Sequence, residues 1–273
     1  MSIDQPGPTR AQRRHAQRLL EAHAARAPIA PLTQDDPELT LTDAYAIQSA
    51  VIGSRTRDGA RVVGRKVGLT SKPMQELLGV GEPDFGVLLD DMAVEDGGAV
   101  PLGALLQPRA EAEIAFLMQA DVEGPNATAA SVLPAIAGAL PAIEIIDSRI
   151  ADWKIGLVDT VADNASSGMF VLGPRLLPLT GLDLRLEGMA LWRDDELVDT
   201  GAGAAVLGNP LRCVAWLANT LAAYGSGLRA GDVVLAGALH KAVPIAGDEV
   251  LRAEFTRLGA VSVRFTTASG DAT

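Results

Sequence analysis

Two glutamates, Glu111 and Glu113, stand two residues apart in the apolar segment 107–116. The segment is typical of a buried strand, in which alternate side chains point to the same face, so both carboxylates are expected on one side. Like charges on a half-buried face repel each other and require a positive charge between them. A divalent cation is the leading candidate, although a solvent-facing strand edge is the commoner explanation for this spacing alone.

A third carboxylate, Glu144, lies in the apolar segment 141–147, which also predicts a strand. Three carboxylates make an all-oxygen ligand set, which suits Mg²⁺ or Mn²⁺. Zinc prefers nitrogen and sulfur ligands, which the lone Cys213 and His240 do not supply. We expect Cys213 in a helix core and interpret His240 as a structural or surface residue, although its loop position leaves a catalytic role open.

Lys66 lies in the predicted strand 61–70, on the face that also carries Gly64, Gly68 and Thr70. The glycines leave space beside the ammonium group, as a ligand pocket requires, and burial there would lower the pKa of Lys66 towards the range of proton transfer. A lysine that reaches solvent from a sheet edge is the alternative. Asp84 lies in the segment 82–86, where a predicted turn would either present its carboxylate or use it for the turn itself.

The composition excludes several classes of protein. With 273 residues, 48% hydrophobic and 21% charged, the chain is long enough for one large core, or for a main domain with a smaller annex. A net charge of −11 and a pI near 4.7 argue against a nucleic-acid surface. A single cysteine, no signal-peptide pattern and no membrane-spanning apolar run predict a cytoplasmic protein.

The remaining elements must position these side chains. The basic segment 9–26 predicts a mostly solvated or subunit-contact helix, and the capping-box pattern at 40–43 begins a second helix that ends at 58–59. Further helices are predicted at 72–78 after Ser71, from Thr128 to about Leu140 with an interruption at Pro134, and from Pro210 after the cap Asn209. Strands are predicted at 169–172, 182–192 and 196–200, the last two as a hairpin. The segment 201–208 lacks the third glycine of a dinucleotide loop.

Several motifs, in one order, resemble the 2-keto-4-pentenoate hydratases of the fumarylacetoacetate hydrolase superfamily. They are Gly64-Arg-Lys-Val-Gly-Leu-Thr-Ser71, Pro83-Asp-Phe-Gly86, Pro108-Arg-Ala-Glu-Ala-Glu-Ile-Ala-Phe116, Ala142-Ile-Glu-Ile-Ile-Asp-Ser-Arg149 and Asp159-Thr-Val-Ala-Asp-Asn-Ala-Ser166. The resemblance runs from about residue 40 to the C-terminus. It implies an α+β fold, a mixed β-sandwich roll with peripheral helices, and homo-oligomers that are often decamers. We expect an N-terminal helical region with the first strand at 1–80, packed on a catalytic β-rich domain at 81–273.

The resemblance also implies roles for individual residues. Glu111, Glu113 and Glu144 would be ligands of Mg²⁺ or Mn²⁺, while Lys66 and Asp84 would face the substrate. The candidate substrate-binding residues are Thr70, Ser71, Asn164, Ser166 and Ser167. The implied reaction adds water to 2-hydroxypenta-2,4-dienoate and gives 4-hydroxy-2-oxopentanoate, in meta-cleavage degradation of aromatic or steroid rings. Our hypothesis gives Lys66 a proton-transfer role, assisted by Asp84.

Three alternatives stay open at this point. The closest is a 2-oxo-3-hexenedioate (4-oxalocrotonate) decarboxylase, which would use the same metal chemistry on a diacid. C–C bond hydrolysis or keto-enol isomerisation is the second. The third is a non-catalytic scaffold or acid-binding partner of a pathway enzyme, and a complex with such an enzyme is a further expectation. The segment 238–244 of this chain departs from the pattern of many hydratases, which carry a Ser or Thr there, and this leaves the tail specificity and a longer 2-hydroxydienoate open.

Overall fold

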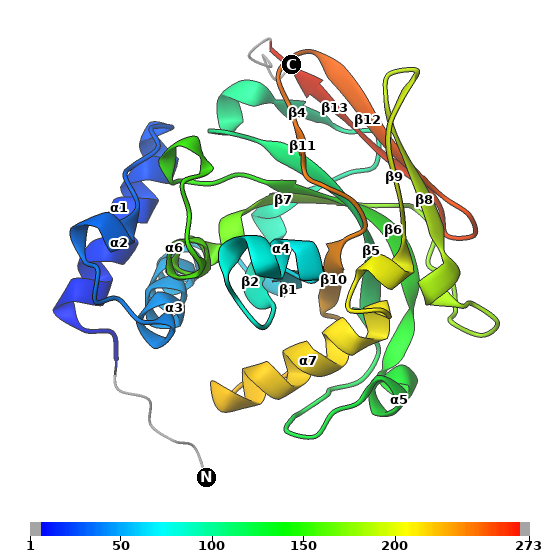
Figure 1. Ribbon diagram of the computed structural model, residues 1–273, viewed down its shortest axis with the longest axis horizontal. Helices are drawn as coiled ribbons and strands as arrows, with labels where there is room; N and C mark the ends of the chain where they lie inside the picture. The colour runs from blue at the N-terminus through cyan, green and yellow to red at the C-terminus, as the bar shows by residue number, and fades with distance from the viewer. Residues whose placement is uncertain (1–6, 268–273) are drawn as a thin grey trace.

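The computed structural model describes residues 7–267, which form two β-sheets with helices packed around them (Figure 1). The helices are α1 (Arg10–Ala25), α2 (Leu32–Asp35), α3 (Leu41–Arg57), α4 (Lys72–Leu78), α5 (Ala129–Val132), α6 (Leu157–Ala162) and α7 (Pro210–Ala223). The strands are β1 (Val62–Gly68), β2 (Asp84–Leu89), β3 (Ala93–Val94), β4 (Ala99–Pro101), β5 (Arg109–Met118), β6 (Ile136–Ile146), β7 (Ser167–Leu172), β8 (Gly188–Arg193), β9 (Glu196–Ala202), β10 (Val233–Ala238), β11 (Val243–Pro244), β12 (Glu249–Phe255) and β13 (Gly259–Thr266).

The larger sheet contains eight strands in the order β2-β1-β10-β5-β6-β7-β3, with β11 paired to β5. Most of its pairs are antiparallel, but β1 with β10 and β3 with β7 are parallel. The smaller sheet has the order β4-β13-β12-β8-β9, and its strands β12 and β13 contact β6 of the larger sheet. Two mixed sheets with helices outside confirm the predicted α+β fold.

The long antiparallel pair β5 and β6 lies in the middle of the larger sheet. Their side chains are buried on both faces, with Ile114, Phe116 and Ile143 on one face and Ala115 and Ala142 on the other. Each buried isoleucine or phenylalanine side chain contributes about 1.5–3 kcal/mol to folding. The pair is therefore a rigid base for the polar side chains that it carries.

Three predicted helix starts are confirmed. Thr9 and Thr40 form capping boxes at the first residues of α1 and α3, and the Asn209 side chain accepts a hydrogen bond from Leu211 N at the start of α7. The helices α1 and α3 pack against each other at one flank of the sheets (Figure 1). About half of α1 is exposed and its His15 is fully buried, so this helix is less solvated than predicted, whereas Cys213 is buried in α7 as expected.

The prediction of one helix from Thr128 to about Leu140 is wrong. The helix α5 ends at Val132, a 3₁₀ turn follows over Leu133–Ala135, and β6 begins at Ile136. Pro134 cannot continue an α-helix, and the apolar run that follows it is long enough to cross the sheet with both faces buried. A continuous apolar run of this kind has no periodicity that separates a buried strand from a helix.

Two smaller predictions are also corrected. The predicted strand 182–192 begins only at Gly188, because Asp183 caps a 3₁₀ turn over Leu184–Leu186 through Arg185 N. Asp84 is the first residue of β2 and not part of a turn. The hairpin of β8 and β9 has its predicted place.

Within residues 7–267, no helix has both the length and the apolar character that a membrane crossing requires. The predicted division of the chain at residue 80 stays a prediction. Strand β1, which precedes that division, pairs with β2 and β10.

Candidate active site

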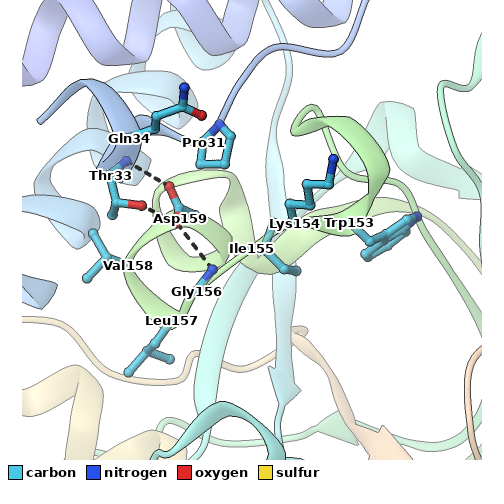
Figure 2. A pocket seen from close by; sticks show the side chains of 10 residues that line it. All are labelled: Pro31, Thr33, Gln34, Trp153, Lys154, Ile155, Gly156, Leu157, Val158 and Asp159. Carbon is cyan, nitrogen blue, oxygen red and sulfur yellow. Dashed lines mark hydrogen bonds between the residues drawn. The ribbon is translucent and has the colours of Figure 1, made fainter. Parts of the chain in front are cut away.

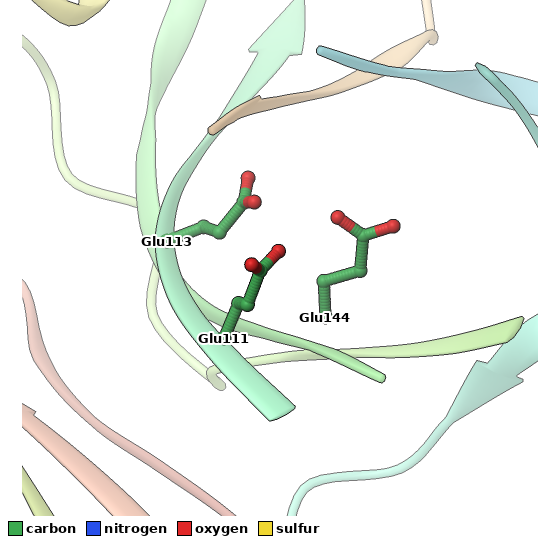
Figure 3. Close-up of side chains that lie close together, drawn as sticks. All are labelled: Glu111, Glu113 and Glu144. Atoms are coloured by element: carbon green, nitrogen blue, oxygen red, sulfur yellow. The ribbon is translucent and has the colours of Figure 1, made fainter. Parts of the chain in front are cut away.

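Glu111, Glu113 and Glu144 converge on one point of the larger sheet (Figure 3). Glu111 lies directly opposite Glu144 in the β5–β6 pair, and Glu113 follows two residues along β5, so all three project from one face. One carboxylate oxygen from each lies within 4.8 Å of those of the other two. Glu113 and Glu144 are buried and Glu111 is half-buried.

This convergence is electrostatically costly in the absence of a counter-ion. Burial, and then the charge of Glu144, raise the pKa of Glu111 to about 7. Burial and both neighbouring glutamates raise the pKa of Glu113 well above its ordinary value, and burial raises that of Glu144. Both Glu144 oxygens are buried with no hydrogen-bond partner among the described residues. A buried carboxylate without partners needs a cation nearby.

Lys66 supplies one positive charge. Its Nζ lies 3.3 Å from Glu144 Oε1, an ion-pair distance without hydrogen-bond geometry, and donates a hydrogen bond to Ala165 O at 3.0 Å. Burial alone would lower the pKa of Lys66, but Glu144 and Asp84 raise it above its ordinary value. The expected lowering of this pKa is therefore wrong, because the lysine faces carboxylates and not an apolar pocket.

Asp84 lies beside Lys66 across Gly68. A methyl group added at Gly68 would lie 2.2 Å from Asp84 Oδ1 and 3.5 Å from Lys66 Nζ, so only glycine leaves room there. Asp84 is 2% exposed, and its Oδ1 has no hydrogen-bond partner in the described part of the chain. Burial raises the pKa of Asp84, and Lys66 opposes that rise only in part.

A pocket of about 760 Å³ begins at Thr70, two residues after the end of β1. Thr70 and Ser71 line it together with Lys72, Pro73, Ala204, Ala205, Leu207, Gly208, Arg212 and Trp216. Thr70 packs against Gly237, where an added methyl group would lie 2.3 Å from Thr70 Oγ1, and Gly237 N donates a hydrogen bond to Glu113 Oε2 at 2.8 Å. Thr70 thus connects the pocket to the carboxylates.

The predicted loop 164–167 lies behind Lys66. The Asn164 side chain bonds both Val87 N and Val87 O, at 2.8 and 2.9 Å, and thereby holds the loop on β2. Ser166 Oγ lies 3.2 Å from Thr160 Oγ1, and Ser167 lines a small cavity of about 30 Å³ under α1. The loop positions the carbonyl that receives Lys66, and direct contact of Asn164, Ser166 and Ser167 with substrate stays a prediction.

A second pocket, of about 550 Å³, lies between α2 and the segment 153–159 (Figure 2). Asp159 accepts hydrogen bonds from Thr33 N and Thr33 Oγ1 and holds the two segments together. The residues that line this pocket, from Pro31 to Asp159, do not include the three glutamates. Neither pocket is lined by the glutamates themselves, but the pocket at Thr70 is connected to Glu113 through Gly237.

Residues 52–266 match the sequence profile described as fumarylacetoacetate (FAA) hydrolase C-terminal, which is well over half of the chain. The chain belongs to the FAA hydrolase family. Among its relatives, a 2-keto-4-pentenoate hydratase from Paraburkholderia xenovorans (strain LB400) is 49% identical over 250 residues, with 92% of this chain and 93% of the relative covered. A 2-hydroxyhexa-2,4-dienoate hydratase from Comamonas testosteroni is 46% identical over 252 residues, with 92% and 96% covered.

A solved structure agrees with the FAA hydrolase fold. The 4-oxalocrotonate decarboxylase from Pseudomonas putida G7, complexed with magnesium and adipate, has a TM-score of 0.91 at 38% identity, with 93% of this chain and 97% of that chain covered. The family and the fold expected from the motifs are confirmed.

The residues of this FAA hydrolase site fit a hard divalent cation. Three carboxylates from two adjacent strands offer oxygen ligands only, and the two Glu144 oxygens, which accept no hydrogen bond from the described residues, lie among them. The sequence did not reveal the backbone groups that complete the site, Gly237 N and Ala165 O. A glycine inside the apolar run 233–239 was the available signal, since glycine in a strand indicates a bulge or a close approach.

Proposed function

We propose that this chain is a divalent-metal-dependent hydratase that adds water to 2-hydroxypenta-2,4-dienoate or a close homologue. The observation that carries the proposal is the convergence of Glu111, Glu113 and Glu144 beside Lys66. The hydratase names of relatives at 46–49% identity over 92% of this chain support the reaction type. The product would be a 4-hydroxy-2-oxoacid.

Glu111, Glu113 and Glu144 would hold Mg²⁺ or Mn²⁺. When bound, the cation supplies a Lewis acid that stabilises charge on the substrate carboxylate and 2-oxygen. Gly237 N–H fixes the Glu113 carboxylate, and the β5–β6 register fixes Glu111 opposite Glu144. The ligand geometry is therefore largely set before substrate binds.

Proton transfer requires a group that gains and loses a proton near neutral pH. Asp84 is the candidate for that role, because burial raises its pKa towards that range and its Oδ1 has no hydrogen-bond partner among the described residues. Lys66 has a raised pKa and a fixed hydrogen bond to Ala165 O, so it suits a permanent positive charge that orients the anionic substrate. We therefore assign the proton at C5 and C3 of the substrate to Asp84 and the electrostatic role to Lys66.

The pocket at Thr70 would receive the substrate tail. Its walls include the apolar side chains Ala204, Ala205, Leu207 and Trp216, which suit a hydrocarbon tail. A volume of about 760 Å³ exceeds the need of a five-carbon acid, so six-carbon and longer 2-hydroxydienoates are candidate substrates.

The proposal is tested by following the ultraviolet absorbance of 2-hydroxypenta-2,4-dienoate in the presence of the purified chain. We expect the absorbance to fall with Mg²⁺ or Mn²⁺ and to persist in excess chelator. No cation-dependent loss with either the five-carbon or the six-carbon dienoate would exclude the hydratase assignment.

Decarboxylation of a diacid is the second candidate, because the decarboxylase structure has a TM-score of 0.91 with this chain. Lys72 and Arg212 line the pocket and would offer positive charge to a second carboxylate. Incubation with 2-oxo-3-hexenedioate separates the candidates. Release of CO₂ would favour decarboxylation, whereas an intact diacid would favour hydration.

We also propose that copies of this chain associate in the cytoplasm. Exposed apolar side chains in or beside the smaller sheet support an interface there, namely Leu186, Leu197 and Val250. Light scattering on the purified chain tests the association, and a monomer at micromolar concentration would contradict it.

A further inference from the structure

His240 lies between β10 and β11, and its imidazole is fully buried. Its Nε2 accepts a hydrogen bond of 2.8 Å from Ala112 N, and its Nδ1 lies 3.6 Å from Asp199 Oδ2. A ring nitrogen that accepts a hydrogen bond carries no proton, so this histidine is neutral with its proton on Nδ1, the nitrogen that faces Asp199.

The hydrogen bond fills a gap in the sheet. Strand β10 pairs with β5 as far as Ala238, opposite Glu113, and β11 resumes the pairing at Val243, opposite Ala110. Between these points, Ala112 O accepts a hydrogen bond from Leu239 N at 3.0 Å, and Ala112 N is bonded to the His240 ring. A side chain thus completes the ladder where the neighbouring backbone turns away.

Ala112 is the residue between the two glutamates of β5. Its N–H belongs to the peptide plane shared with Glu111, and its C=O belongs to the plane shared with Glu113. His240 therefore fixes the first plane and Leu239 N fixes the second. The direction in which each glutamate leaves the backbone depends on these planes, so the ring acts on the carboxylates through one peptide unit.

We propose that His240 is a positioning residue of the cation site, which holds Glu111 and Glu113 in the orientation that a divalent cation requires. The inference rests on the proposed cation site. A group that orients ligands in this way changes cation affinity by about tenfold to a hundredfold when it is removed.

The test compares Mn²⁺ dissociation constants, measured by calorimetry, for the full chain and its variants. We expect His240→Leu, which lacks an acceptor, to weaken Mn²⁺ binding by roughly tenfold or more. His240→Gln places Oε1 near the position of Nε2 and is expected to stay within about threefold of the parent. His240→Asn is polar but too short to reach Ala112 N, so its Mn²⁺ binding is expected to resemble that of His240→Leu. If the Leu variant does not fold, the comparison of the Gln and Asn variants still tests the proposal.

Leu19→Ala in α1 is the matched control, because Leu19 is 2% exposed and its loss lowers stability without removing a ligand of the cation site. It should leave Mn²⁺ binding unchanged. Parent-like binding by both His240→Leu and His240→Asn would overturn the inference, as would equal weakening in His240→Gln. Failure of the parent to bind Mn²⁺, or parent-like binding by Glu144→Gln, would instead refute the cation site itself.

Discussion

The site combines the permanent positive charge of Lys66 with the charge of a cation that the three glutamates would hold. Lys66 lies 3.3 Å from Glu144 and is held by Ala165 O, so its ammonium group balances one carboxylate charge. Two of the three glutamate charges then remain in a buried space, and one divalent cation would balance them. The site therefore needs both the lysine and the metal ion for electrical balance.

Replacement of Lys66 by methionine removes the lysine charge and keeps the three metal ligands, so the two contributions can be measured separately. We expect Lys66→Met to lower turnover by roughly a hundredfold to a thousandfold, because the substrate loses its fixed electrostatic partner. Mn²⁺ binding should be retained, since the three ligands remain and one repelling charge is gone. Initial rates and calorimetry on the same preparation provide both readouts.

Glu144→Gln is the matched variant, since it removes a ligand and keeps Lys66. It should lose Mn²⁺ binding and turnover together. Full turnover in Lys66→Met with metal bound would show that the lysine has no part in the reaction.

Strand β1 carries Lys66 and, at Gly68, leaves space for the Asp84 carboxylate. A methyl group added at Gly68 would lie 2.2 Å from Asp84 Oδ1, so only glycine fits at this position. We expect Gly68→Ala to displace the Asp84 carboxylate and to lower turnover by about a hundredfold, the usual cost of moving a reacting group by about 1 Å. Gly103→Ala is the control, because an added methyl group there meets nothing within 4 Å.

The measurement for this pair is the initial rate at saturating Mg²⁺, together with the melting temperature of each variant. A Gly68→Ala enzyme with the rate of Gly103→Ala would contradict the placement of Asp84 in proton transfer.

At the level of elements, the sequence predicted what alternation and capping control. The shared face of Glu111 and Glu113 follows from the period of a strand, and the starts of α1, α3 and α7 follow from local caps. The position of Glu144 opposite Glu111 depends on the register between two strands, which no single segment encodes. The motif resemblance implied that the three glutamates share a metal site, but it did not predict this register.

The missed features share one physical origin. The start of β6 at Ile136, the bond from His240 to Ala112 N and the hold of Asn164 on Val87 all depend on neighbours distant in sequence. The same holds for the raised pKa of Lys66, since burial alone predicted the opposite direction and the nearby carboxylates decide it. Tertiary contacts therefore determine the chemistry of residues that local patterns had only located.

On the scale of the whole molecule, the net charge of −11 repels anionic substrates, so their capture depends on local positive charge at the site. The three glutamates lie on β5 and β6, the central strands of the larger sheet, so a cation bound there would act on the core of the fold. A cation bound by the folded chain alone should raise the melting temperature.

This stabilisation is expected to depend on pH. Because burial raises the pKa of Glu111 to about 7, a proton occupies this carboxylate below that pH and must leave before a cation binds. Cation affinity should therefore rise as the pH rises through about 7 and fall by up to about tenfold for each unit below it. The rise in melting temperature caused by Mn²⁺ should be larger near pH 8 than near pH 5.5, as differential scanning fluorimetry would measure. An equal shift at both values would place the bound cation away from Glu111.

The proposed reaction is the addition of water to a dienoate at the site formed by Glu111, Glu113, Glu144 and Lys66. Mass spectrometry of the product formed from 2-hydroxypenta-2,4-dienoate in water enriched in heavy oxygen tests it most directly, with the parent chain and Glu144→Gln compared in Mg²⁺. We expect the parent to form a 4-hydroxy-2-oxopentanoate that carries the heavy oxygen at C4, and the variant to form no product. An unhydrated product from the parent, or equal hydration by Glu144→Gln, would contradict this proposal.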